Sequence, residues 1–412
     1  MRESLIAGLD IGSTKTAVVI VEVSARDPKR PETRVLGVGQ AKTTGIRREI
    51  VTDIEATTQS VRKAVKEAEL MAGVAVNRLY TGVAGEHIHA RASSGVVAVG
   101  GEEIQPRDVD RVHEVARAVV VPVDREVLHA IPQEYLVDSQ GGIRDPVGMA
   151  GTRLEAEVFI VTGSSTAAQN IRKSVSRAGY KVEALVLEPI ASALATLSED
   201  EKELGVALVE LGGGSTDIAL FHEHKIRHLA TLPWSGSTVT NDIVKGLSLP
   251  YAEASRVKER YGSAYSAAVD THETLEVSGP AAGQTRHVGR EILAHIIEQR
   301  MDEILNLASD QIERSGHGDR LGGGVVLTGG GASLAGITEL AERIFSAPVR
   351  CGFPGEGLGG LADSVRRPKF ATAAGLALYG AGQLLSGAAS PGASARVDGV
   401  VRRVRDWLAD FF

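Results

Sequence analysis

Two stretches of the chain, about two hundred residues apart, have nearly the same sequence. The first spans Gly8–Lys15 and the second spans Val209–Asp217. Each contains an acidic residue, glycines and hydroxyl side chains between two apolar runs, a pattern that predicts a strand, a tight turn and a second strand. A single hairpin of this kind is most often only a turn. Two matched copies predict two related domain halves, and this duplication constrains the fold more than any other feature of the sequence.

The chemistry of the two hairpins indicates what the halves would hold. Glycine lets a phosphate approach the backbone N–H groups, which form an anion-binding concavity in such turns. The neighbouring acids, Asp10 and Glu210, are suited to hold Mg²⁺ through water, because this ion gives up its hydration shell reluctantly. The duplicated hairpins therefore predict one nucleotide bound between the two halves.

The bulk properties of the chain exclude several classes of protein. Its 412 residues are enough for two or three domains with substantial cores. The formal net charge of −7 argues against non-specific binding to nucleic acid. Cys351 is the only cysteine, which excludes a disulfide framework and favours a reducing compartment. We interpret Cys351 itself as a small core residue. The N-terminal residues lead directly into a strand pattern, with no secretory signal.

The segment 370–395 has no charged residue, which raises the question of whether it spans a membrane. Its helical part, Phe370–Ala389, is rich in alanine and glycine and contains polar side chains such as Thr372 and Gln383. This composition is too weakly hydrophobic for a span. We therefore expect a buried helix whose small side chains allow a neighbouring backbone to approach closely. The residues after it, 383–398, have the composition of a linker.

Hydrophobic periodicity predicts helices at Ile54–Ala72, Ser165–Ala178 and Arg290–Ser309, with short strands between them. Between Val83 and about Phe159 the pattern changes to that of a small α+β unit. This unit follows the first strands of the first half and precedes its last ones. It is therefore expected to be an insertion into the first half.

Two further motifs have both a structural and a functional interpretation. Gly329–Gly331 follows a strand and precedes a helix, which fits either a helix-entry turn or a loop that faces a base or ribose. Glu188 precedes Pro189, which is favourable chemistry for the start of a helix. The same carboxylate would also suit a residue that orients an attacking water on a γ-phosphate. The sequence alone leaves both alternatives open.

In chain order, these pieces resemble the five motifs of the actin, sugar-kinase and heat-shock-chaperone ATPase superfamily. Within it, the chain is similar to FtsA, the family of bacterial cell-division proteins that tether FtsZ to the membrane. The resemblance runs from about residue 5 to 380 and resumes at the C-terminus. The segments that carry the narrower match are Val127–Tyr135, Asp145–Met149, Leu204–Val206, Val326–Gly331 and Phe370–Leu376.

This resemblance implies an α/β, actin-like two-lobed ATPase fold of duplicated ribonuclease-H-like domains, with an inserted IC subdomain and a C-terminal amphipathic helix. The expected boundaries follow the chain. They are 1–82 and 161–204 for subdomain IA, 83–160 for IC, 205–224 and 311–382 for IIA with a closing helix, 225–310 for IIB, 383–398 for a linker and 399–412 for the amphipathic helix.

The resemblance also implies residues that bind ATP and Mg²⁺. Glu188, Asp10 and Glu210 match the catalytic positions, and the last two also match the positions that hold Mg²⁺ through water. Lys258 lies on the helix that resembles the adenine-facing one. The remaining nucleotide-binding positions are Gly12, Ser13, Thr14 and Lys15 in the first motif, Gly212, Gly213, Gly214, Ser215, Thr216 and Asp217 in the second, and Gly329, Gly330 and Gly331 in the nucleoside loop.

Two departures from the family pattern bear on hydrolysis. The second motif usually has aspartate where this chain has Glu210, and one extra methylene moves the carboxylate by roughly 1.5 Å. Ser255 stands where a ribose-contacting glutamate is common in the family. ATP binding is therefore expected, with ATPase activity weak or absent, as in an assembly switch.

The C-terminal segment Val400–Phe412 predicts an amphipathic helix. At about 100° per residue its apolar side chains share one arc and its charged ones lie opposite, the composition of a helix in a membrane interface. A helix docked on the domain's own core is the alternative. The residues expected to enter the membrane are Val401, Val404, Trp407, Leu408, Phe411 and Phe412.

The family resemblance implies the partners as well. These are the FtsZ C-terminal peptide, further copies of the chain in an actin-like filament, the lipid surface, and other division proteins through IC, with no nucleic acid. The resemblance also implies that the protein is located on the cytoplasmic face of the inner membrane, at the place of division. Arg286, Arg290 and Arg300, placed on one helix of IIB, are candidate contacts for the acidic FtsZ peptide, or else ordinary solvated residues. The rival functions are a pilus-assembly ATPase of similar build and a small-molecule kinase.

Overall fold

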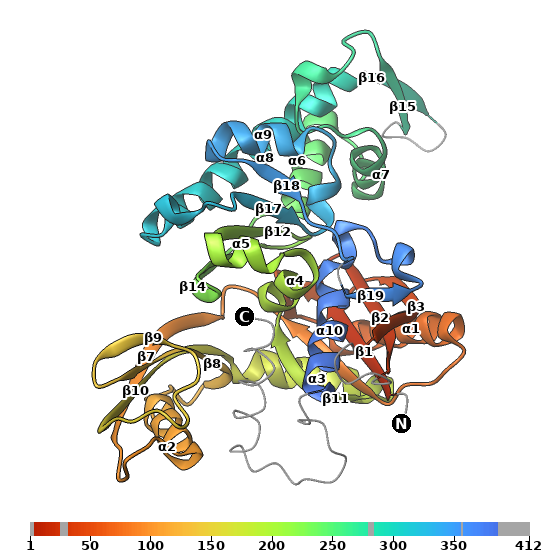
Figure 1. Cartoon of the computed structure of the whole chain (residues 1–412). Helices are drawn as coiled ribbons and strands as arrows, with labels where there is room; N and C mark the ends of the chain where they lie inside the picture. The colour runs from red at the N-terminus through yellow and green to blue at the C-terminus, as the bar shows by residue number, and fades with distance from the viewer. Residues whose placement is uncertain (1–3, 25–31, 279–283, 356, 386–412) are drawn as a thin grey trace.

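The computed structural model describes residues 4–24, 32–278, 284–355 and 357–385. They form two lobes, with a small unit that projects from the first (Figure 1). Each lobe is built on one mixed sheet with helices packed against it, so the α/β class expected from the sequence is confirmed. The predicted membrane-binding residues 401–412 lie outside the described ranges.

The sheet of lobe I has six strands in the order β11-β6-β1-β2-β3-β19. Helix α1 begins where Asp53 accepts a hydrogen bond from the Ala56 N–H at 3.0 Å, and it ends at Gly73, whose φ is 68°. With α3 it covers one face of the sheet, and α10 covers the other. The elements are β1 (Ser4–Ile11), β2 (Lys15–Ser24), β3 (Glu32–Lys42), α1 (Ile54–Ala72), β6 (Arg78–Val83), α3 (Ser165–Ala178), β11 (Lys181–Leu187), β19 (Leu358–Gly360) and α10 (Ala371–Leu385).

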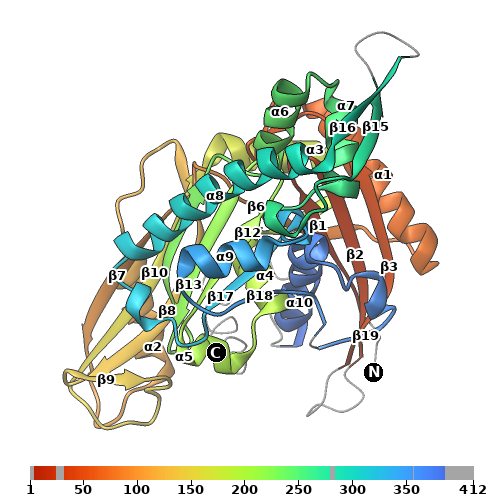
Figure 2. The ribbon, with the colours of Figure 1, turned by 90° about the horizontal axis from the view of Figure 1, so that it is seen from above.

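The sheet of lobe II has five strands in the order β14-β13-β12-β17-β18. The long helix α8 crosses this lobe (Figure 2), and with α6, α7 and α9 it buries the larger hydrophobic core. The elements are β12 (Val206–Leu211), β13 (Thr216–His222), β14 (Lys225–Leu232), α6 (Gly236–Leu247), α7 (Tyr251–Tyr261), α8 (Arg290–Arg314), β17 (Val325–Thr328), α9 (Ile337–Phe345) and β18 (Val349–Cys351).

The two sheets repeat one another, as the duplicated hairpins predict. In each, three antiparallel strands are followed by a parallel strand beside the first and another parallel strand beyond it. The register is also repeated: Asp10 pairs with Ala17 in lobe I, and Glu210 pairs with Asp217 in lobe II. Asp10 and Glu210 are therefore structural counterparts, and Asp217 is an acid that only lobe II has at its position.

The unit inserted in lobe I is a four-stranded sheet, β7-β10-β8-β9, with one helix, α2, and its own core. The helix begins at Pro106, and Gln105 and Asp108 form a capping box in front of it. The expectation of a separate α+β insertion is confirmed. Its elements are β7 (His89–Ala98), α2 (Pro106–Arg117), β8 (Arg125–Val137), β9 (Gln140–Ile143) and β10 (Arg153–Ser164).

Helix α10 is the buried helix that its small residues predict. It packs on β1 of lobe I and on α4 (Glu188–Thr196), the helix between the lobes. At Gly375 a methyl group would lie 1.7 Å from the Ala191 carbonyl oxygen, so this contact requires glycine. The described part of the helix runs to Leu385. No helix within the described ranges is long and apolar enough to cross a membrane.

One sequence expectation in lobe II is wrong. Arg286 does not share a helix with Arg290 and Arg300, because it lies in β16 (Thr285–Gly289), which pairs with β15 (Thr274–Ser278) as a hairpin. The helix α8 starts only at Arg290. The segment Thr285–Gly289 is too short for its side-chain pattern to distinguish a strand from a helical turn.

Candidate functional site

A cleft of about 770 Å³ lies between the two lobes, within the size range of small-molecule sites. Both glycine turns and the Gly329–Gly331 loop line it, together with α6 and α7. Nearly all the predicted nucleotide-binding residues face this one cavity. The exceptions are Gly214, which lies against Ser13, and Thr216, whose hydroxyl donates a hydrogen bond to the Trp234 carbonyl at 2.9 Å.

The two glycine turns have the same geometry and meet across the lobe boundary. The Gly12 N–H donates to the Lys15 carbonyl at 3.1 Å, and the Gly212 N–H donates to the Ser215 carbonyl at 3.0 Å. A methyl group at Gly213 would lie 2.5 Å from the Thr14 hydroxyl oxygen. The absence of a side chain at this position therefore allows the turns to approach each other at one end of the cleft.

Lys15 links the first turn to the C-terminal part of the chain. Its ammonium group lies 3.1 Å from the Asp10 carboxylate and donates a hydrogen bond to the Lys369 carbonyl at 2.6 Å. A cation held in this position can neutralise a phosphate placed against the turn. Lys15 also fixes Asp10, so both residues are oriented before any ligand is present.

Five acidic side chains converge on this end of the cleft, and each is less than 9% exposed. Burial raises the pKa of Glu49 to about 8, with the charge of Asp217 as the next cause. Burial likewise raises the pKa of Glu210 to about 7, and the pKa values of Glu188 and Asp217 in the same direction. The fifth acid is Asp10. A divalent cation bound among these groups would relieve their repulsion.

No group of three or more His, Cys, Asp or Glu side chains within the described ranges is arranged to hold a metal ion directly. Asp10 and Glu210 nevertheless face the same cleft beside the two turns. This arrangement fits Mg²⁺, which keeps most of its water and is commonly held by one or two carboxylates together with substrate phosphates.

The extra methylene of Glu210 has a visible consequence. Its carboxylate accepts a hydrogen bond from the Ser192 hydroxyl at 2.7 Å and another from Thr372. Ser192 lies on α4 and Thr372 on α10, so the side chain of this lobe II strand is held by helices that pack on lobe I. A shorter aspartate at this position would not reach both hydroxyls.

Glu188 begins α4, with Pro189 next to it in the first turn, so its helix-start chemistry is present. Its side chain lies over β6, since a methyl group at Gly82 would be 2.7 Å from its carboxylate oxygen. Within the described part of the chain no hydrogen bond or ion pair fixes this carboxylate, which lines the cleft. The position is therefore compatible with both alternatives that the sequence left open.

The other end of the cleft is lined by α7 and the Gly329–Gly331 loop. Lys258 donates hydrogen bonds to the Gly236 carbonyl and the Thr240 hydroxyl, both at 2.8 Å, and burial lowers its pKa to about 8. Ser255 donates to the Glu259 carboxylate at 2.8 Å. Glu259 therefore brings a carboxylate to this wall, one helical turn from the position where the family commonly has it.

Glu49 and Thr372 are among the residues of the cleft that sequence reasoning missed. Glu49 occupies a turn where φ is positive at both Arg48 and Glu49, and neither is a residue type that signals such a turn. Thr372 acts through a contact with Glu210 that is distant in the sequence. Thr372 lies in the family-matching segment Phe370–Leu376, but its contact with Glu210, like the position of Glu49, is revealed only by the three-dimensional arrangement.

The three arginines proposed for the FtsZ peptide already have partners within lobe II. Arg290 pairs with Glu273 at 2.6 Å, and Arg300 pairs with Asp242 at 2.5 Å. Arg286 donates to the Ser248 carbonyl at 3.5 Å. All three are half-buried, so an acidic peptide would have to share or replace these partners.

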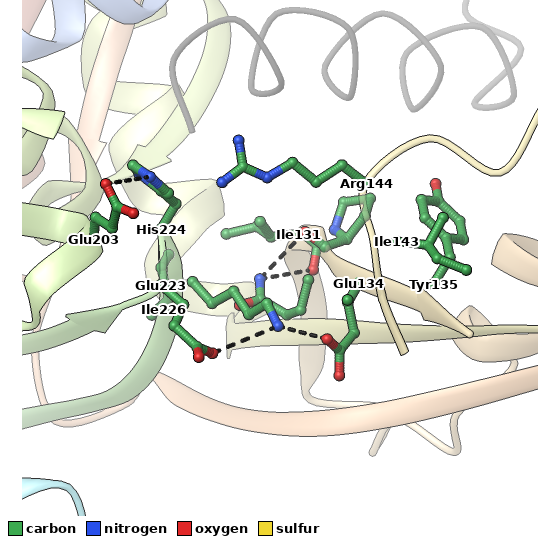
Figure 3. A pocket seen from close by; sticks show the side chains of 13 residues that line it. Ile131, Glu134, Tyr135, Ile143, Arg144, Glu203, Glu223, His224 and Ile226 are labelled. Atoms are coloured by element: carbon green, nitrogen blue, oxygen red, sulfur yellow. Dashed lines mark hydrogen bonds and ion pairs between the residues drawn. The ribbon is translucent and has the colours of Figure 1, made fainter. Parts of the chain in front are cut away.

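A second cavity, of about 420 Å³, lies where the inserted unit meets lobe II (Figure 3). Its walls come from β8, from the turn between β13 and β14, and from α5 (Glu199–Leu204). Lys225 of lobe II pairs with Glu134 of the inserted unit at 2.6 Å. The cavity and this ion pair mark a second contact between the lobes, remote from the glycine turns.

The duplicated sheets, the facing glycine turns and the acidic cleft define an actin-like protein with a cleft between its two lobes. Solved structures support this class of fold. The chain is similar to a protein of a PilM-PilN type IV pilus biogenesis complex (TM-score 0.63, 18% identity, covering 91% of this chain and 98% of that one). It is also similar to MreB5 of Spiroplasma citri bound to ADP (TM-score 0.53, 12% identity, covering 91% and 95%).

Sequence comparison identifies the particular family. The family described as Cell division protein FtsA matches residues 207–375, and the SHS2 domain inserted in FTSA matches residues 85–162. The chain is 43% identical to Cell division protein FtsA of Pseudomonas aeruginosa, covering 91% of this chain and 89% of that protein. It is 40% identical to the Neisseria meningitidis protein of the same name, covering 100% and 99%. The chain belongs to the FtsA family of cell-division proteins, which decides against the pilus and kinase alternatives.

The raised pKa values in the cleft predict how stability depends on pH. Glu210 ionises near pH 7 when folded, above its ordinary pKa of 4.5, so the folded chain binds more protons between these values. The free energy of unfolding without ligand should therefore fall as the pH rises from about 5 to about 8. Glu210→Gln should reduce this fall by on the order of 2 kcal/mol. Urea unfolding at a series of pH values measures it.

Glu102→Gln is the matched control, because Glu102 is exposed and lies far from the cleft in the inserted unit. It should leave the pH dependence unchanged. An unaltered slope in Glu210→Gln would contradict a raised pKa at Glu210.

Proposed function

We propose that the protein binds ATP with Mg²⁺ between its lobes, polymerises on the cytoplasmic face of the inner membrane and tethers FtsZ there during division-ring assembly. Membership of the FtsA family supports the cell-division role. The single observation that carries the nucleotide part is the meeting of two equivalent glycine turns over one cleft. Such turns offer backbone N–H groups to phosphate from both lobes.

In this proposal the phosphates lie at the end of the cleft formed by the turns, and the nucleoside lies toward Lys258 and the Gly329–Gly331 loop. A methyl group at Gly329 would lie 2.6 Å from the Leu211 carbonyl, and φ there is 80°. Glycine at this position lets the nucleoside loop lie against the strand that leads into the second turn. Asp10 and Glu210 would hold the hydrated Mg²⁺, which neutralises the phosphate oxygens.

Hydrolysis is proposed to be weak. A water-activating carboxylate must be ionised and free to approach the terminal phosphate. Glu188 is free of hydrogen-bond partners in the described part of the chain, but burial raises its pKa. Glu210 is held by Ser192 and Thr372 instead of pointing freely at the phosphate. These features suit a nucleotide-dependent assembly switch better than a turnover enzyme.

The membrane part of the proposal depends on residues 400–412. A helix of this length is marginal in water, so we propose that it forms on the lipid surface, where its apolar face is buried. One such anchor binds weakly. A filament presents many anchors at once, so ATP-dependent polymerisation would strengthen membrane binding by avidity.

The partner part of the proposal places the FtsZ C-terminal peptide on subdomain IIB and other division proteins on the inserted IC unit. The acidic peptide would exchange with Glu273 and Asp242 as partners of Arg290 and Arg300. Exchange of one carboxylate for another costs little when the pairs are partly exposed. A pull-down with an FtsZ tail peptide, compared with an unrelated acidic peptide of equal charge, tests this contact.

Glu210→Asp should increase phosphate release from ATP. The shorter side chain loses its bonds to Ser192 and Thr372, which frees the carboxylate to face the cleft. Asp10→Ala should instead weaken ATP binding, because it removes one of the two acids proposed to hold Mg²⁺. A phosphate-release assay and an ATP-binding assay on both variants separate these effects. No gain in phosphate release from Glu210→Asp would contradict our explanation of weak turnover.

Trp407→Glu should reduce binding to anionic vesicles in a co-sedimentation assay, since it places a charge on the face that enters the lipid. Ala409→Glu is the control of equal charge, because residue 409 lies on the polar face of the predicted helix. Equal vesicle binding by Trp407→Glu and the unmodified protein would overturn the membrane anchor.

A further inference from the structure

The hairpin of β4 (Ile46–Arg47) and β5 (Ile50–Val51) places one side chain into the nucleotide-type cleft. At its tip, Arg48 and Glu49 have φ values of 45° and 61°, in the left-handed region that L-residues rarely adopt. Arg48 is exposed, whereas Glu49 is only 8% exposed. Positive φ at both positions is the type I′ turn of a two-residue hairpin, as at Asp138–Ser139 and Glu223–His224, and here the turn directs the Glu49 side chain into the cleft.

The contacts that hold Glu49 are with the two glycine turns. The Ser13 hydroxyl donates to the Glu49 carboxylate at 2.9 Å, and the Glu49 N–H lies 3.2 Å from the same hydroxyl oxygen. A methyl group at Gly214 would lie 3.2 Å from the Glu49 carboxylate. The carboxylate is therefore between Ser13 of lobe I and Gly214 of lobe II, against both turns at once.

This position is electrostatically unfavourable for a carboxylate. Burial raises its pKa most, the charges of Asp217, Asp10 and Glu210 raise it further, and in the described part of the chain no cation pairs with it. The ammonium group of Lys15, in the first glycine turn, is paired with Asp10 instead. Burying an ionised acid without a counter-ion is energetically unfavourable. A phosphate that enters together with Mg²⁺ would occupy the same place at a lower electrostatic cost.

We propose that the Glu49 carboxylate occupies the place of a nucleotide phosphate between the two turns, and that the β4–β5 hairpin is a gate which the phosphate displaces. This inference rests on the proposed nucleotide function of the cleft. A carboxylate and a phosphate both accept hydrogen bonds from hydroxyl and N–H donors, so one can stand in for the other.

When the phosphate enters, the Ser13 hydroxyl would donate its hydrogen bond to a phosphate oxygen instead of to the Glu49 carboxylate. The Glu49 side chain would then leave the cleft. β5 contacts α3 on the outer face of lobe I. Movement of the hairpin on phosphate binding would therefore alter the surface of that lobe. Glu49 would thus act as a regulatory residue that lowers the affinity of the empty cleft for ATP.

The test compares the affinities of Glu49→Gln, the unmodified chain and Glu102→Gln for Mg-ATP and Mg-ADP by titration calorimetry. Glutamine keeps an acceptor for the Ser13 hydroxyl but removes the charge. At pH 9, above the raised pKa of Glu49, we expect Glu49→Gln to bind Mg-ATP on the order of tenfold more tightly, with a smaller gain for Mg-ADP, because a like charge at contact distance is removed. Glu102→Gln, a change of equal charge in the inserted unit, should match the unmodified chain.

Glu49→Gly is the second variant, since glycine also relaxes the left-handed turn. It should bind Mg-ATP at least as tightly as Glu49→Gln, and thermal unfolding establishes that both variants are folded. Hydrogen exchange of residues 45–52 in the unmodified chain should increase when Mg-ATP binds.

The outcomes separate the two claims. If the unmodified chain binds Mg-ATP and Glu49→Gln binds it equally or more weakly, the gate is wrong and the nucleotide site stands. If neither the unmodified chain nor any variant binds Mg-ATP, the proposed function fails and the gate fails with it.

Discussion

The contact between the two glycine turns is the constraint on which the rest of the structure depends. Each turn is the end of a hairpin in the central sheet of its lobe, so the position of a turn is the position of its sheet. A side chain at Gly213 would push Thr14 away and separate the lobes. The cleft, the approach of the acids and the bridge from Glu210 to α4 and α10 all follow from this close approach.

The buried acids of the cleft repel one another. Five buried acids face one another, and only Asp10 is paired with a cation among the described residues. The two lobes are also joined behind the cleft, where Leu187 and Ile190 share a core with Leu208 and Phe221, and by the pair of Glu134 with Lys225. These contacts keep the lobes together while the acids repel. Binding of a cation with phosphate would then convert repulsion into attraction, which is how a ligand shifts an equilibrium between arrangements of two lobes.

Much of this arrangement could be predicted from the sequence, because the duplicated hairpins, the helix periodicities and the inserted unit are local patterns. The α1 and α3 helices have the bounds that their periodicity and caps predict. Glu49 and the hydroxyl partners of Glu210 could not be predicted, since they depend on contacts between segments far apart in the chain. Arg286 was misplaced because a five-residue strand carries too little periodicity to be told from a helical turn. Local patterns define the elements, whereas the details of the site arise where the lobes meet.

The central claim is that both lobes bind one nucleotide. Titration calorimetry with Mg-ATP on the unmodified chain, Gly12→Ala and Gly213→Ala tests it most directly, because the two substitutions lie in the turns of different lobes. The account predicts one ATP per chain and a loss of affinity of roughly tenfold or more in either variant, since a methyl group at Gly213 displaces Thr14 and one at Gly12 crowds the turn beside Asp10. Two ATP molecules per chain, or unchanged affinity in one of the variants, would contradict it.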